Sequence, residues 1–272
     1  MKKTIDFIQK ESFKIYKKKY SKEYIEKNLL PIINYILVSK KTNFLFSGSQ
    51  GIGKTTLIKI ISNTLSKVYG KTILSLSLDD YYLSKSSRLN LAKKQHNLLI
   101  TRGVPGTHKI KKLISDIKKH NKSIFPIETP IFDKLIDDSI KKKKIVRKKS
   151  DILILEGWCC GCSEINKSYL NKNINQLEKE FDKNYYWRKF YNNQLKNDYK
   201  KLFNLFDEKI YIKAPSFKYV INWRLKQEKR NLSNSKKLKR MNINEIKIFI
   251  QHYEKITRWM ISKYSKSADL VI

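Results

Sequence analysis

The chain has 272 residues, of which 59 are Lys or Arg and 24 are Asp or Glu, so its formal net charge is +35. A hydrophobic content of 40% is that of a globular protein and excludes a disordered chain. Only eight of the basic residues are Arg, whereas a surface that reads nucleic-acid bases and phosphates relies on Arg. We therefore interpret the charge as a Lys-coated surface and expect no specific nucleic-acid partner.

The expected elements alternate between helices and strands along most of the chain. This alternation predicts an α/β fold with a mainly parallel, doubly wound sheet and flanking helices. We find no internal repeat and no domain boundary, so we expect a single domain over 1–272 in which 1–40 form N-terminal helices. In chain order we expect two helices within 4–39, a strand at 44–46, a helix at 54–68 that Gly70 ends, a buried strand at 72–78, a less regular region at 81–150 with a helix near 109–120, a strand at 151–157, helices within 168–206, a strand at 208–214, a helix at 216–230, a linker at 231–240, a helix at 243–264 and an edge strand at 268–272.

Membrane and secreted classes do not fit the sequence. The longest apolar run, 29–38, is short and contains Asn34, whereas a membrane span needs roughly 20 apolar residues. Asp6 and Gln9 interrupt the start before an apolar signal segment could form. The three cysteines all lie in CCGC at 159–162, which argues against a disulfide framework and against zinc. We expect a cytoplasmic protein that has no membrane association.

The sequence GSQGIGKT at 48–55 matches G-x-x-x-x-G-K-[ST] at every position, with a strand expected before it and a helix after it. The glycines let backbone N–H groups turn toward phosphate oxygens, which a Cβ would obstruct. Lys54 should reach the β- and γ-phosphates, and the Thr55 hydroxyl should bind Mg²⁺. The predicted nucleotide-binding residues are Gly48, Ser49, Gln50, Gly51, Ile52, Gly53, Lys54, Thr55 and Thr56.

Acidic residues end two of the expected strands. We place the strand before Asp79 and Asp80 beside the P-loop strand, so that a carboxylate there could take a proton from a hydroxyl that attacks the γ-phosphate. The alternative role is an N-cap for a helix over 81–95, and we expect one of the two aspartates to take it. Glu156 ends the strand at 151–156 and is predicted to hold the water shell of the magnesium ion.

Basic residues stand at two further positions that suit an anion. The stretch TRGVPGTHKI at 101–110 has two glycines and a proline, so it should form a rigid loop that fixes Arg102 and His108. Arginine suits a carboxylate or phosphate, although a carbonyl-capping Arg and a turn His remain open. Arg224 lies on an expected helix and could close onto the transferring phosphoryl group, or could pair with Glu228 on a solvated face.

Seven stretches together resemble the D-glycerate 3-kinase family, in the phosphoribulokinase/uridine kinase branch of P-loop kinases. The resemblance spans about 30–272, and RGVPGTH and LEGWCCG are far more specific to this family than the P-loop is. The stretches are SGSQGIGKTT (47–56), SLDDYY (77–82), RGVPGTH (102–108), PIFDKLIDD (130–138), LILEGWCCG (153–161), NWRLKQE (222–228) and HYEKITRWM (252–260).

This resemblance implies a P-loop NTPase fold with a helical lid at about 216–240, and ATP with Mg²⁺ as cofactors. It implies that Asp79 is the general base, that Arg224 falls in the lid, and that Arg102 and His108 help to bind a small hydroxy acid. The predicted catalytic residues are Lys54, Asp79 and Arg224. Lys109 and Ser139 depart from the family, which usually has Asp and Arg at these positions. The chain also stops at 268–272, where relatives often continue.

Three hypotheses follow for the function. The first is a kinase that converts D-glycerate to 3-phosphoglycerate, and the second is the same machinery with another acceptor, such as a nucleoside or a pantothenate-like alcohol. The third is a basic P-loop ATPase that binds nucleic acid, for which the aromatic residues within 185–201 would be the stacking surface. Their helical spacing favours core packing instead, and the acidic strand ends favour a kinase. The residues do not indicate an oligomeric state.

Overall fold

The computed structural model of this protein describes residues 1–233 and 243–272. Its first half contains α1 (Lys2–Tyr16), α2 (Lys22–Tyr24), a π-helical turn (Ile25–Leu29), α3 (Leu30–Val38), β1 (Asn43–Gly48), α4 (Lys54–Tyr69), β2 (Ile73–Ser77), a 3₁₀ turn (Leu78–Tyr81), α5 (Lys85–Lys94), a second 3₁₀ turn (Asn97–Ile100), α6 (Ile110–Asn121), β3 (Ile127–Thr129), β4 (Phe132–Asp133), β5 (Asp138–Ser139) and β6 (Lys144–Val146). Its second half contains β7 (Ile152–Gly157), α7 (Lys167–Asn171), α8 (Gln176–Phe181), α9 (Tyr186–Gln194), a π-helical turn (Leu195–Tyr199), α10 (Lys200–Phe203), β8 (Glu208–Ile212), α11 (Phe217–Ser233), α12 (Ile243–Ser262), a 3₁₀ turn (Tyr264–Lys266) and β9 (Leu270–Val271).

A five-stranded sheet in the order β2-β7-β1-β8-β9 forms the centre of the molecule, and all of its neighbouring strands are parallel. The predicted α/β fold with a doubly wound parallel sheet is confirmed. The order corrects one expectation, because β7 lies between β2 and the P-loop strand β1. The strand before Asp79 is thus an edge strand rather than a neighbour of β1. Its serines, Ser75 and Ser77, alternate with apolar residues, which suits a strand that is only partly buried.

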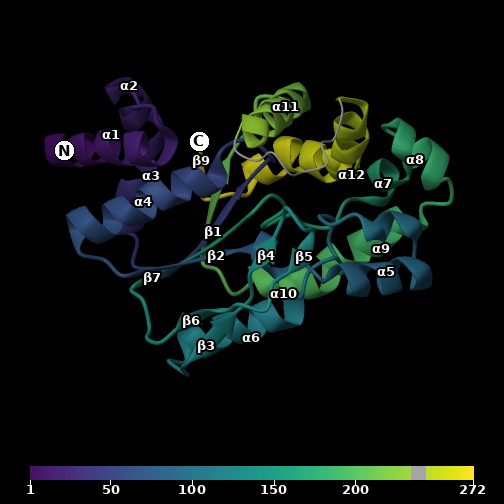
Figure 1. Ribbon diagram of the computed structural model, residues 1–272, viewed down its shortest axis with the longest axis horizontal. Coiled ribbons are helices and arrows are strands. Elements are labelled where there is room, and N and C mark those ends of the chain that lie inside the picture. The colour runs from purple at the N-terminus through teal and green to yellow at the C-terminus, as the bar shows by residue number, and fades with distance from the viewer. Residues whose placement is uncertain (234–242) are drawn as a thin grey trace.

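Side chains alternate between the two faces of the sheet, and each face has its own apolar core. In β1, Leu45 packs on one face, whereas Phe44 and Phe46 pack on the other. Helices α1, α3 and α4 cover the Phe44 face, and α6, α9 and α12 contribute to the Leu45 face (Figure 1). The continuous apolar run of β7 is buried on both faces, as expected for a central parallel strand. Gly70 ends α4 in the left-handed conformation, with φ 68°, as predicted.

Two small two-stranded antiparallel sheets, β3–β6 and β4–β5, lie in the less regular region expected before residue 150. Their strands have two or three residues, too short for an alternating pattern to reveal them in the sequence. Three aromatic residues of α9 and the following turn, Trp187, Tyr191 and Tyr199, are core residues as predicted and at most 1% exposed, whereas Tyr186 of the same helix is 64% exposed. Among the described residues, no helix has both the length and the apolar character to cross a membrane.

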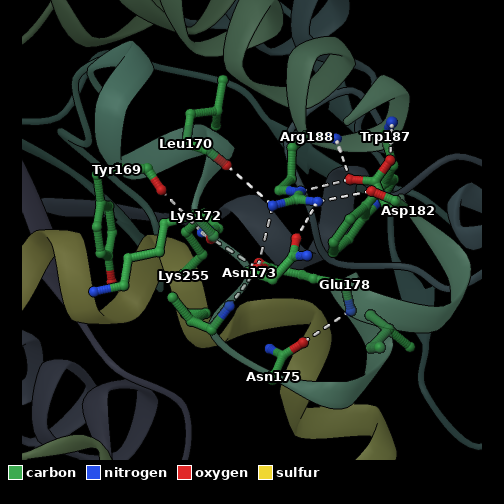
Figure 2. Close-up of polar contacts among 12 residues, drawn as sticks. Tyr169, Leu170, Lys172, Asn173, Asn175, Glu178, Asp182, Trp187, Arg188 and Lys255 are labelled. Carbon is green, nitrogen blue, oxygen red and sulfur yellow. Dashed lines mark hydrogen bonds and ion pairs between the residues drawn. The ribbon is translucent and has the colours of Figure 1, made fainter. Parts of the chain in front are cut away.

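A buried group of ion pairs fixes α12 against α8 and α9 (Figure 2). Arg188 Nε lies 2.7 Å from Asp182 Oδ2, and Glu178 Oε2 lies 3.5 Å from Arg188 and 3.2 Å from Lys255 Nζ. These four side chains, which we call the Arg188 cluster, are 0–2% exposed. Their charges balance, so each one is compensated within a region that solvent does not reach. The cluster therefore anchors α12 to α8 and α9.

Candidate active site

The P-loop between β1 and α4 is folded as its motif requires. Gly51 and Gly53 have φ values of 78° and 92°, a left-handed conformation that side chains rarely adopt. Lys54 is buried, and its Nζ donates a hydrogen bond to the Ser49 carbonyl at 3.1 Å. The Ser49 hydroxyl and both amide atoms of Gln50 are buried without a hydrogen-bond partner among the described residues. The Ser49 hydroxyl and the Gln50 amide N–H groups are therefore donors whose hydrogen bonds a phosphate oxygen could accept.

Glu156 at the end of β7 lies beside Thr55. The Thr55 hydroxyl donates to Glu156 Oε1 at 3.0 Å, and the Ser77 hydroxyl donates to the same oxygen at 2.8 Å. A hydroxyl and a carboxylate are oxygen ligands of the kind that Mg²⁺ prefers, so the pair fits the predicted ion. Within the described residues no group of three His, Cys, Asp or Glu could bind a metal by itself. A Mg²⁺ ion here would take its other ligands from phosphate and water.

Asp79 lies in the 3₁₀ turn after β2 and has two partners. Its Oδ2 is 2.6 Å from Lys134 Nζ, and its Oδ1 accepts a hydrogen bond from the Tyr82 hydroxyl at 2.9 Å. Burial raises the pKa of Asp79, but the charges of Lys134 and Lys54 and these hydrogen bonds outweigh it and hold the pKa well below its usual range. Asp79 is therefore ionised. Its pKa is lowered by Lys54 of the P-loop even though β7 lies between β2, which precedes Asp79, and β1, which precedes the P-loop.

Asp80 has a different role from Asp79. It accepts hydrogen bonds from the Phe132 backbone N–H at 3.4 Å and from Lys144 Nζ at 3.0 Å, so it contacts a strand of each of the two small sheets.

Neither aspartate caps the next helix. That helix begins only at Lys85, and its N-cap is Ser84, which accepts from Ser87 N at 3.2 Å. The expectation that one of the pair is an N-cap was therefore wrong, because the chain turns for several residues first.

Arg102 holds a carboxylate, as its residue type suggested, but the carboxylate is that of Asp137. Asp137 also pairs with Arg88 at 2.5 Å, and Phe132 lies 5.7 Å from both guanidinium groups. The Tyr253 hydroxyl of α12 donates to the Arg102 carbonyl at 2.7 Å. Gly103, at φ 134°, leaves room for the Tyr253 ring, because a Cβ there would overlap it. The loop is therefore fixed from α12.

His108 lies on the same loop and is almost completely buried. Its ring stacks on Tyr82 at 4.4 Å between centroids, and its Nδ1 is hydrogen bonded to the Tyr199 hydroxyl. Burial lowers the pKa of His108 to about 3, although Asp79 opposes the shift, so the imidazole is neutral. Tyr82 bonds to Asp79 and stacks on His108, and it thereby joins the acidic strand end to the RGVPGTH loop.

Helix α11 lies on the P-loop. A Cβ on Gly51 would be 2.8 Å from the Trp223 Cβ and 3.2 Å from the Arg224 backbone nitrogen. The Arg224 guanidinium carbon is 5.2 Å from the centre of the Phe249 ring of α12. The suggested pairing of Arg224 with Glu228 concerns a side chain outside the described ones. The expected lid at about 216–240 begins with α11, but 234–242 lie outside the described residues.

Lys134, Asp137 and Tyr253 were not among the site residues predicted from the sequence. Lys134 and Asp137 stand in the quoted stretch PIFDKLIDD, and Tyr253 stands in HYEKITRWM, so the resemblance was the available signal. The two departures from the family pattern face each other, since Lys109 Nζ donates to Ser139 Oγ at 3.0 Å. A lysine–serine hydrogen bond thus stands where the family pattern implies an aspartate and an arginine.

The chain is similar to known kinases in sequence. It is 28% identical over 218 residues to "Uncharacterized kinase mug58" of Schizosaccharomyces pombe, covering 76% of each chain. It is 34% identical over 142 residues to "Probable ATP-dependent kinase TDA10" of Saccharomyces cerevisiae, covering 47% of this chain and 49% of that one. A shorter match, 29% identical over 43% of this chain and 37% of the other, is to a pantothenate kinase of Latilactobacillus sakei. No protein-family model matches the chain.

The fold of this chain is also similar to that of solved structures. The YGR205w protein superposes with a TM-score of 0.63 at 28% identity, covering 86% of this chain and 82% of that one. A D-glycerate 3-kinase of Cryptococcus neoformans superposes with a TM-score of 0.66 at 22% identity, covering 95% of this chain and 87% of that one. The predicted resemblance to kinases is confirmed in sequence, and the predicted P-loop NTPase fold is confirmed by these structures.

Proposed function

Starting from a P-loop kinase fold, we propose that this chain is an ATP-dependent small-molecule kinase that phosphorylates a hydroxy acid, with D-glycerate as acceptor and 3-phosphoglycerate as product. The observation that carries the proposal is the position of ionised Asp79. The charge of the P-loop lysine, Lys54, lowers the pKa of Asp79. Through Tyr82, Asp79 is also connected to the loop that carries Arg102 and His108. A carboxylate in that position suits a hydroxyl that attacks the γ-phosphate.

Each site residue has a distinct task in this proposal. Gly48 to Thr56 hold the phosphates of ATP, Lys54 stabilises the charge on the transferring group, and Arg224 approaches it from α11. Asp79 accepts the proton of the acceptor hydroxyl, and the acceptor carboxylate replaces Asp137 on Arg102. Mg²⁺, held by Thr55 and through water by Glu156, would neutralise phosphate charge. Residues 1–272 act as one kinase domain, with α11 as part of its lid.

The same residues could also phosphorylate acceptors other than D-glycerate. Two observations indicate which acceptors should be tested. The match to pantothenate kinases concerns less than half of this chain, and Arg102 would suit the carboxylate of pantothenate as well as that of glycerate. The acidic residues at the strand ends, Asp79 and Glu156, lie beside the P-loop. In our proposal Asp79 is the base for an acceptor hydroxyl rather than for water. We therefore expect ADP release to depend on an added acceptor, in the order D-glycerate, pantothenate, uridine.

The test measures ADP release by a coupled assay with each acceptor and with none. Asp79→Asn should lower kcat by roughly 10²–10⁴ with little change in ATP affinity, because it removes the base. Arg102→Ala should mainly raise the KM of a carboxylate acceptor and affect a neutral alcohol less. Arg147→Ala, at an exposed arginine in the basic segment after β6, is the matched control. Equal ADP release with and without acceptors would show that water is the acceptor and would refute the proposal.

A further inference from the structure

One nitrogen of His108 has no hydrogen-bond partner, although the residue is only 5% exposed. Among the described residues, His108 Nε2 is a buried polar atom without a partner, whereas Nδ1 on the same ring is bonded to Tyr199. Buried polar atoms are nearly always satisfied, so an orphan at a site indicates a place for a ligand or water. Nε2 lies across the ring from Tyr199, and the ring face stacks on Tyr82, the hydrogen-bond donor to Asp79.

The hydrogen bonds of Tyr199 decide which ring nitrogen carries the proton. The Tyr199 hydroxyl accepts from the Gly106 backbone N–H at 3.1 Å, and its other partner is His108 Nδ1. The hydroxyl proton therefore has Nδ1 as its acceptor, which leaves the proton of the neutral imidazole on Nε2. The opposite tautomer would direct two N–H donors at one hydroxyl and leave a fully buried hydroxyl proton unpaired, which is unfavourable.

The surroundings keep this imidazole neutral. Asp79 is the charged group that acts on His108, and Tyr82 and Tyr199 are its aromatic neighbours on the two packed elements. Burial outweighs the attraction of Asp79 and lowers the pKa of His108, so the ring does not gain a proton at neutral pH. Asp79 itself is reached by solvent beside Lys134, whose side chain is 55% exposed. A ligand can therefore approach Asp79 from the Lys134 side.

We propose that Tyr199 is a positioning residue that fixes His108 as a neutral Nε2–H donor, and that this N–H binds an oxygen of the phosphoryl acceptor next to Arg102. The inference rests on the proposed function and assigns separate roles to Arg102 and His108 in binding the acceptor. Arg102 supplies the positive charge for a carboxylate, whereas His108 supplies an uncharged donor. A protonated histidine would instead add a second cation beside Arg102 and Asp79.

The tautomer is tested directly by ¹⁵N nuclear magnetic resonance of the histidine rings in the ligand-free protein. We expect the His108 signals of a neutral ring with a protonated Nε2 and an unprotonated Nδ1, unchanged from pH 5 to 8. A protonated Nδ1, or titration within that range, would overturn the proposal. This measurement requires no acceptor, so it distinguishes a failure of this inference from a failure of the proposed function.

Three variants test the role of the donor. Tyr199→Phe should mix the two tautomers and raise the KM of the acceptor about tenfold, with the KM of ATP unchanged. The control is Tyr191→Phe, another buried tyrosine, whose hydroxyl has no partner among the described residues. His108→Gln keeps an N–H donor near the Nε2 position, whereas His108→Asn keeps one only near Nδ1. Gln should retain acceptor affinity and Asn should lose it, and the reverse result would refute the assignment.

Discussion

Two groups of ion pairs, both in contact with α12, differ in how far solvent reaches them. In the Arg188 cluster every charged side chain is at most 2% exposed, and Lys255 of α12 is one of its members. Around Asp79 and Arg102 the partners Lys134 and Asp137 are 55% and 38% exposed, and Tyr253 of α12 holds the adjoining loop. Charges that are buried and paired cannot change partners without a large penalty. Exposed partners can be exchanged at little cost, so the second group can release its charges to a phosphate or a carboxylate.

The largest expected effect comes from the phosphate loop. Lys54→Ala should lower turnover by about 10²–10³, because a charge that stabilises the transferring group is lost, while the melting temperature changes little. Lys59→Ala, at an exposed lysine on the same helix, is the matched control. Coupled ADP release and thermal unfolding measure the two properties. If Lys54→Ala keeps more than a few percent of wild-type turnover, the P-loop assignment is wrong.

The Arg188 cluster should show the opposite behaviour. Arg188→Met leaves Glu178 and Asp182 with one cation, Lys255, so we expect the free energy of unfolding to fall by about 3–5 kcal/mol. Activity per folded molecule should remain, because the residue lies outside the site. Denaturant unfolding followed by assays of the folded fraction separates the two. Lys189→Met, an exposed neighbour on α9, controls for the loss of a charge. A stable but inactive Arg188→Met would show that the cluster is more than structural.

The smallest effect should appear at Lys134 and should be visible only in the pH profile. Asp79 must be ionised to accept a proton, so activity is lost as pH falls through its pKa. Lys134 lowers that pKa, and Lys134→Met should therefore move the acid-side loss of kcat to higher pH. Lys144→Met removes the matched partner of Asp80 and should leave the profile in place. An unchanged profile for Lys134→Met would mean that Asp79 does not limit the reaction on the acid side.

Local sequence could predict the nucleotide side of the site because its geometry is local. Eight consecutive residues form the P-loop, and Lys54 and Thr55 occupy fixed places in it. Glu156 could be predicted because it ends a continuous apolar strand, and such strands lie in the centre of a parallel sheet. The surroundings of Asp79 and Arg102 could not be predicted in this way, because they depend on contacts between segments that are distant in the sequence. Lys134 approaches Asp79 from 55 residues away, and Tyr253 bonds to Arg102 from 151 residues away.

The sequence by itself determined the parallel α/β fold, the phosphate loop and the residue types of the RGVPGTH loop, since periodicity and glycine placement act within a few residues. Only the tertiary structure decided the strand order, in which β7 separates β2 from β1, because periodicity does not report which strands are neighbours. Only the tertiary structure also decided that Asp137 pairs with Arg102, that Ser84 rather than an aspartate caps α5, and that Tyr199 bonds to His108. These pairings follow from chain packing, in which side chains far apart in sequence satisfy one another's charge and hydrogen bonds.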